Sequence, residues 1–187
     1  MVVDPAVVEL LGAAELSKVS IFVASCTERM AQLFTGLRGG DESRSEDVDF
    51  YLATLDDLWI LGGSNDDFVA RSEVLKEFVE LEPSEEGLTD LSDIYSFYSV
   101  LCLRYAILFR VSGEVEYAMK CAHASLTALG QLDRNAVGTS FFEGESEYQR
   151  QLFDGDTAES GVTLRLRGRD RQIGLERYSA ILSRRFK

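Results

Sequence analysis

The residues with the clearest chemical potential are Glu28 and Arg29, a charged pair inside the nearly apolar stretch SIFVASCTERMAQLFTGL at 20–37. Such a pair suits a catalytic constellation, a docking point or a buried structural link. An unpaired charge costs several kcal/mol to bury, so Glu28 needs Arg29, Arg104 or a backbone group as a partner. We predict that Glu28, Arg29 and Arg104 form a structural ion pair or a hydrogen-bond network between the two central helices.

Signatures of common enzyme classes are absent from the sequence, which has neither a glycine-rich phosphate loop nor a Gly-x-Ser-x-Gly elbow. The single histidine, His123, excludes two-histidine metal motifs and leaves little material for a catalytic triad. We therefore predict a protein that is not an enzyme and holds no metal or cofactor. The cysteines lie in apolar helical patterns and are expected to be small core residues: Cys26, Cys102 and Cys121.

Carboxylates occur repeatedly as adjacent pairs. Neighbouring side chains on a helix point about 100° apart, which suits display on a surface better than joint chelation of a cation. Four such pairs are our candidates for contact with a basic partner: Asp41, Glu42, Asp56, Asp57, Asp66, Asp67, Glu85 and Glu86.

The net charge of −13 is distributed unevenly. Residues 161–187 carry eight basic and two acidic side chains, a balance of +6, which leaves −19 on 1–160. An acidic protein repels nucleic acid and favours basic partners. The basic tail contains only two aromatic residues and does not resemble a nucleic-acid-binding segment. We expect it to pack on the acidic body or to engage the acidic segment of a second copy in a homo-oligomer.

The spacing of apolar residues predicts an all-α fold. Asp4-Pro5 starts a short helix ending near Gly12, and 17–37 forms an amphipathic helix covered on both sides. A helix capped by Ser43 or Ser45 follows. Another, capped by Ser64, runs until Pro83 and is peripheral.

The second half of the chain contains the strongest helical pattern, which begins at 91 and ends at the turn Ser112-Gly113-Glu114. A helix to 134 returns along it and completes a central αα-hairpin. A short helix follows at 144–153. The tail begins either as an alternating strand or as one basic helix, and is helical at least from 173 to 183.

We predict a single-domain bundle of six to eight helices, with an acidic body at 1–160 and a basic helical arm at 161–187 packed on the same domain. The N-terminus lacks the basic start of a secretory signal, and no uncharged apolar run of about 18 residues is present. The expected location is the cytoplasm, without membrane contact.

Four segments carry a family resemblance: CTERM at 26–30, LDDLW at 55–59, EPSEEGLTDLSDIY at 82–95 and SGEVEYAMKCAHASL at 112–126. In their order and spacing, over roughly 15–153, the chain resembles the YjaG-like family, bacterial all-helical domains of unknown biochemical activity. Family members commonly continue the first segment with Pro-Asn-Tyr, where this chain has Ala31-Gln32-Leu33, and the basic tail has no family counterpart. Because similar domains occur beside toxin genes, the resemblance implies an immunity protein.

Our leading hypothesis is a non-enzymatic immunity protein whose acidic surface neutralises a cognate toxin, for example a nuclease with a basic substrate groove. The alternative is a small helical enzyme or ligand sensor with a pocket near Glu28, Arg29 and Arg104. An apolar pocket holding a perturbed carboxylate favours the alternative, whereas a filled core at these residues favours the binding protein.

Overall fold

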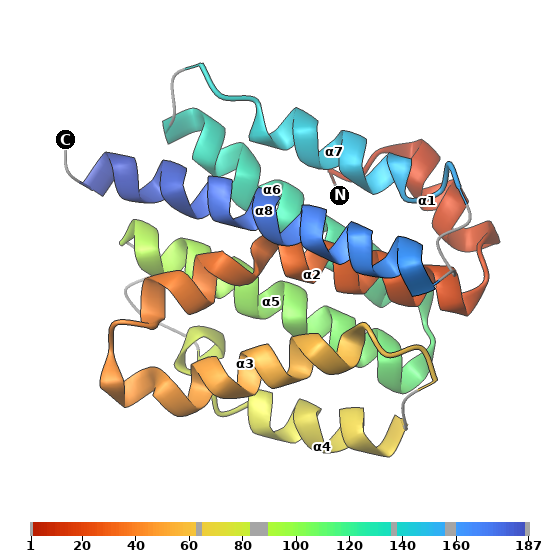
Figure 1. Cartoon of the computed structure of the whole chain (residues 1–187), viewed down its shortest axis with the longest axis horizontal. Helices are drawn as coiled ribbons and strands as arrows, with labels where there is room; N and C mark the ends of the chain where they lie inside the picture. The colour runs from red at the N-terminus through yellow and green to blue at the C-terminus, as the bar shows by residue number, and fades with distance from the viewer. Residues whose placement is uncertain (1, 63–64, 83–89, 136–137, 156–159, 186–187) are drawn as a thin grey trace.

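The computed structural model describes residues 2–62, 65–82, 90–135, 138–155 and 160–185. These residues form eight α-helices and two short 3₁₀-helices, with no strand among them, so the all-α prediction is confirmed (Figure 1).

The central helix is α2, Leu16–Arg38, which begins and ends within one residue of the predicted 17–37. Fifteen of its 23 residues are buried, because α3, α5, α6 and α8 all pack against it. The expectation that this helix is covered on both sides is confirmed. The helix before it, α1 (Pro5–Ala13), opens as predicted: the Asp4 carboxylate accepts a hydrogen bond from the Ala6 amide.

The predicted αα-hairpin is formed by α5, Leu91–Ser112, and α6, Val115–Asn135. Gly113 lies between them with φ 72°, a left-handed conformation that glycine adopts without strain. By length and hydropathy α5 is also the one helix in the described residues that could cross a membrane. In this structure α5 packs between α2, α4 and α6, and half of its most apolar stretch is buried.

The third and fourth helices differ from the prediction at their ends. The third helix, α3 (Ser45–Leu58), begins after the 3₁₀-helix η1 (Glu42–Arg44), which Asp41 caps through the Ser43 amide. Neither predicted serine therefore caps α3. The fourth helix, α4 (Asn65–Leu75), is shorter than predicted and is followed by a second 3₁₀-helix, η2 (Val79–Leu81). Its predicted cap, Ser64, lies outside the described residues.

The basic tail is one helix, α8 (Ser160–Arg185), and not a strand at any described residue. It lies along α2, with α7 (Phe141–Gln151) and α1 on one side of this pair and α3 and α4 on the other (Figure 1). The two helices approach closely at Gly174, where a Cβ atom would lie 3.2 Å from the carbonyl oxygen of Glu28. Glycine at this position therefore allows α8 to contact the α2 backbone.

Candidate functional site

The Glu28-Arg29 pair lies at the middle of α2, where adjacent positions point in different directions and reach two separate groups of partners. The Arg29 side chain is completely buried, and that of Glu28 is 2 % exposed. No hydrogen bond or ion pair joins the two residues to each other within the described structure. The prediction that they pair together is therefore wrong.

Arg29 forms a two-pronged contact with Glu145 of α7, in which Nε and Nη2 donate to the two carboxylate oxygens at 2.8 Å each. Its Nη1 donates to Ser25 Oγ at 2.8 Å and to Asp170 of α8 at 3.3 Å, and Nη2 also reaches the Cys26 sulfur. These five contacts match the five N–H donors of a guanidinium group. Arg29 therefore has no donor left for a ligand.

Glu145 is the centre of this group, which we call the interior network: Ser25, Arg29, Glu145, Asp170 and Arg177. Besides Arg29, the Glu145 carboxylate accepts hydrogen bonds from Arg177 Nη2 at 2.7 Å and Gln149 Nε2 at 2.9 Å. Burial acts to raise the pKa of Glu145, but Arg29 and Arg177 outweigh it and hold the pKa well below its ordinary value. The carboxylate is therefore charged at neutral pH.

Within the interior network two guanidinium groups face two carboxylates, and Asp170 also pairs with the exposed Arg169 at 3.2 Å. Asp170 accepts a short hydrogen bond from Ser25 in addition to its contact with Arg29, and its side chain is fully buried. Burial acts to lower the pKa of Arg29, but Glu145 and Asp170 raise it well above its ordinary value. The network joins α2, α7 and α8, so it fixes the basic arm on the body.

Glu28 has different partners, and with them it forms what we call the Glu28 cluster: Glu28, Trp59, Arg167 and Arg171. Trp59 Nε1 donates to one carboxylate oxygen at 2.9 Å, and Arg167 Nε donates to the same oxygen at 3.0 Å. Arg171 Nε donates to the other oxygen at 3.0 Å. The carboxylate is thus satisfied by the basic arm and the end of α3.

Arg104, the third residue of the predicted ion pair, is exposed on α5 and contacts neither Glu28 nor Arg29. It points away from the buried side of α5, on which Leu103 and Ala106 lie. The three residues therefore do not surround a common pocket. The side chains of Glu28 and Arg29 are both buried, at 2 % and 0 % exposure.

A fourth buried carboxylate, Glu80 of η2, was not among the predicted residues. It accepts hydrogen bonds from Arg38 at 3.1 Å and from both Nη atoms of Arg44, at 3.0 and 2.6 Å. Arg38 also reaches Asp93 at 2.6 Å. This cluster joins the end of α2 to η1, η2 and α5.

The predicted contact carboxylates lie in three settings. Asp56 pairs with Arg167, and Asp57 pairs with Arg71. Asp41 caps η1, and its hydrogen bonds with Ser43 lower its pKa. Glu42, Asp66 and Asp67 are exposed in η1 and α4. The remaining two, Glu85 and Glu86, lie outside the described residues.

The exposed side of α3 carries an acidic stripe that extends the predicted set. Glu46, Asp49 and Asp56 are all exposed, and their spacing places them within about 80° of one another around the helix. Glu42 precedes them in η1. We call Glu42, Glu46, Asp49 and Asp56 the acidic face. The first three form no ion pair with any described residue.

The single histidine and the cysteines have the surroundings of structural residues. His123 Nδ1 accepts a hydrogen bond from the Val2 amide at 3.2 Å, and burial lowers the pKa of the imidazole. Cys26, Cys102 and Cys121 are buried and unbridged, as predicted for core residues. Burial raises the pKa of the Cys26 thiol well above its ordinary value.

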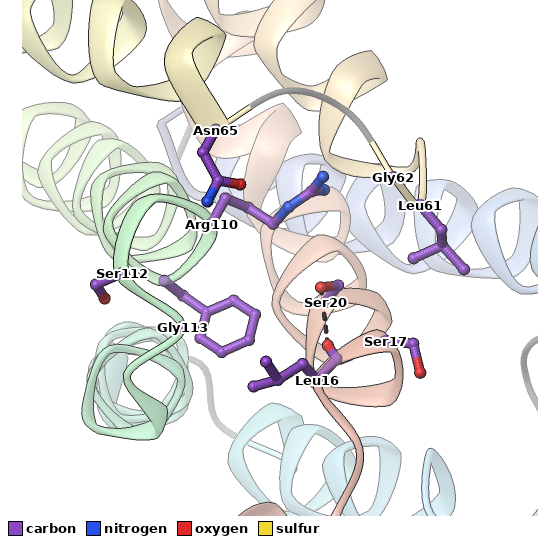
Figure 2. Close-up of a pocket in the computed structure, with 10 residues that line it drawn as sticks. Leu16, Ser17, Ser20, Leu61, Gly62, Asn65, Arg110, Ser112 and Gly113 are labelled. Carbon is purple, nitrogen blue, oxygen red and sulfur yellow. Dashed lines mark hydrogen bonds between the residues drawn. The ribbon is translucent and has the colours of Figure 1, made fainter.

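Two shallow cavities share Leu61 as a lining residue, at the end of the bundle where α3 ends. One, of about 490 Å³, lies between the end of α3 and the start of α8 and is lined by Trp59, Ile60, Leu164 and Arg167. The other, of about 420 Å³, lies beside the start of α2 and contains Arg110, Phe109 and Asn65 (Figure 2). Neither Glu28 nor Arg29 lines either cavity.

The partners of the α2 charges come from residues that the sequence pattern did not single out. Glu145 lies in a turn-rich region, and Asp170 and Arg177 belong to a tail that reads as uniformly basic and exposed. One signal was available: Asp170 and Glu176 are the only acidic residues in 161–187, and Asp170 stands between two arginines.

Comparison with models of protein families, with curated proteins and with solved structures gives no match for this chain.

Proposed function

We propose that this chain is a non-enzymatic binding protein, an immunity protein of the bacterial cytoplasm, whose acidic face contacts a basic toxin domain. The observation that carries the proposal is the division of charges in the structure. The buried charges at the centre are matched by internal partners, whereas Glu42, Glu46 and Asp49 face solvent and form no ion pair with any described residue.

Three physical points support this reading. The side-chain polar atoms of Glu28 and Arg29 all have hydrogen-bond partners within the protein, which favours a structural role for the pair. Exposed carboxylates in register along α3 resemble a row of phosphates and suit a basic groove. The resemblance of four sequence segments to YjaG-like domains is the basis for choosing a toxin as the partner.

The proposal is tested by affinity purification of the tagged full chain from its own cells at moderate salt, with mass spectrometry of the retained proteins. We expect one stoichiometric partner with a basic toxin domain. Its toxicity should be lost when the two are produced together. Recovery of the chain alone, or of a partner whose activity is unchanged in the complex, would contradict the proposal.

A further test distinguishes the effect of the acidic face on binding from the effect of the net charge of the protein. The double variant Glu42→Lys/Asp49→Lys removes two carboxylates of the acidic face, and Glu9→Lys/Glu176→Lys makes the same change in net charge on exposed positions of α1 and α8. Only the first variant should lose protection against the partner. Equal loss in both would show that total charge, and not this surface, governs binding.

A further inference from the structure

Arg110 is a buried cation whose partners do not balance its charge. It lies near the end of α5 and is 8 % exposed. Its Nη1 and Nη2 donate to the carbonyl oxygens of Leu58 and Ile60, each at 3.1 Å, and the guanidinium lies 4.5 Å from the centroid of the Phe68 ring. These bonds use two of its five N–H donors. No described carboxylate lies within ion-pair distance.

The partners of Arg110 supply only partial negative charge. The Leu58 carbonyl ends α3 and the Ile60 carbonyl lies just beyond that end, where a helix carries roughly half a negative charge. The carboxylate that acts to raise the pKa of Arg110 is Asp57, which is paired with Arg71. Burial lowers the pKa of Arg110, and Asp57 opposes this only in part. Arg29, by contrast, has an acceptor for each donor.

Arg110 lines the cavity of about 420 Å³ beside the start of α2, and its side chain extends from α5 across that space toward the end of α3 (Figure 2). Apolar walls come from Leu16, Leu61 and Phe109. Hydroxyl and amide groups come from Ser17, Ser20 and Asn65. The cavity thus combines apolar surface with one strong cation, as small-molecule sites commonly do.

The first turn of α2 adds a second positive contribution. Glu15 occupies the N-cap position but forms no side-chain cap hydrogen bond. The amide groups of Leu16 and Ser17 have no acceptor among the described residues, and both residues line the cavity. The start of a 23-residue helix carries partial positive charge that favours an anion. Asp66 and Asp67 of α4 are exposed nearby but do not line the cavity.

We propose that this cavity binds a small organic carboxylate. The carboxylate lies against the remaining N–H donors of Arg110 and the first turn of α2, and the apolar part of the ligand lies against Leu16, Leu61 and Phe109. A planar guanidinium group matches a carboxylate in geometry and charge. The apolar walls favour an organic anion over inorganic phosphate. This site is separate from the acidic face, and its existence does not depend on the proposed function.

The experiment is an NMR titration of the ¹⁵N-labelled full chain with benzoate, with inorganic phosphate as the comparison anion, at about 150 mM NaCl. We expect saturable shifts with benzoate in the amides of Leu16 and Ser17 and in the Nε–H of Arg110. The dissociation constant should lie below about 1 mM, as for a small ligand with one charged contact. Phosphate should bind at least about tenfold more weakly.

Two matched variants locate the ligand. Leu61→Glu places a carboxylate at the cavity wall, and Ile60→Glu makes the same change at the next residue, which lines the other cavity. Both side chains are exposed, at 39 % and 56 %, so both variants should fold. Benzoate binding should weaken at least about tenfold in the first and less than about twofold in the second.

Arg110→Lys keeps the charge but not the forked geometry, and it should also bind at least about tenfold more weakly. The amide spectrum of each variant shows whether it has folded. The proposal is overturned if shifts do not saturate, if phosphate binds as tightly as benzoate, or if Leu61→Glu binds benzoate as the wild type does.

Discussion

Removing the negative charge of Glu145 should strongly destabilise the protein. Glu145→Gln preserves the shape of the side chain but leaves Arg177 without a carboxylate and Arg29 with only Asp170. The side chains of both arginines are at most 1 % exposed, so water cannot replace the lost partner. Breaking a buried ion pair by removing one member costs about 3–5 kcal/mol.

The assay is equilibrium unfolding in urea, followed by circular dichroism and by the fluorescence of Trp59, the single tryptophan. With a slope near 3 kcal/mol per molar urea, a loss of about 4 kcal/mol lowers the midpoint by roughly 1.3 M. The control is Glu147→Gln on the same helix, because Glu147 is exposed and pairs only with exposed groups. That variant should unfold with the wild type. A loss below about 1 kcal/mol for Glu145→Gln would refute the structural role of the interior network.

The same contacts predict a pH dependence: because the folded pKa of Glu145 lies below its unfolded value near 4.3, its contribution is complete above that pH and is lost as the pH falls. The acid limb of stability should be shallower in Glu145→Gln, and an unchanged limb would contradict the assignment. Gly174→Val should lower the free energy of unfolding by about 1–3 kcal/mol, because the larger side chain forces α8 away from the carbonyl oxygens of Glu28 and Arg29. Gly168→Ala should raise it by roughly 0.5–1 kcal/mol, because no atom lies near the added Cβ. Thermal unfolding measures both changes. The thiols of Cys26, Cys102 and Cys121 should not react with a thiol reagent until the protein unfolds, since all three are buried and the pKa of Cys26 and Cys121 is raised. Fast labelling of the native protein would show that the core opens readily.

The regular parts of the fold were accessible to prediction because their signals are local. Apolar spacing located α2 and α5 to within a residue or so, and Asp4-Pro5 and Gly113 marked helix ends through backbone preferences that act at one position. The acidic segment was harder. The buried position of Glu80 in the 3₁₀-helix at 79–81 depends on contacts with Arg38 and Arg44 from elsewhere in the chain, which no local pattern contains.

The partners of Glu28 and Arg29 were missed for a related reason. Burial of the two charges could be predicted from the surrounding apolar residues, but the choice of partner depends on how α7 and α8 cross α2. Arg104 lies on a predicted central helix, whereas Arg167 and Asp170 lie in the basic tail. Only the tertiary arrangement shows that the tail residues are the partners. The Arg110 cavity gave no sequence signal, because an arginine near a helix end usually contacts the last carbonyl groups.

The most direct test of the proposed function is the association rate with the captured partner at low and high salt, compared between the wild type and two variants. If the acidic face steers the partner, Glu42→Lys/Asp49→Lys should associate about tenfold more slowly at low salt, and the difference should shrink at high salt. Glu9→Lys/Glu176→Lys should associate almost as fast as the wild type. An equal rate for all three proteins at low salt would contradict a role for the acidic face.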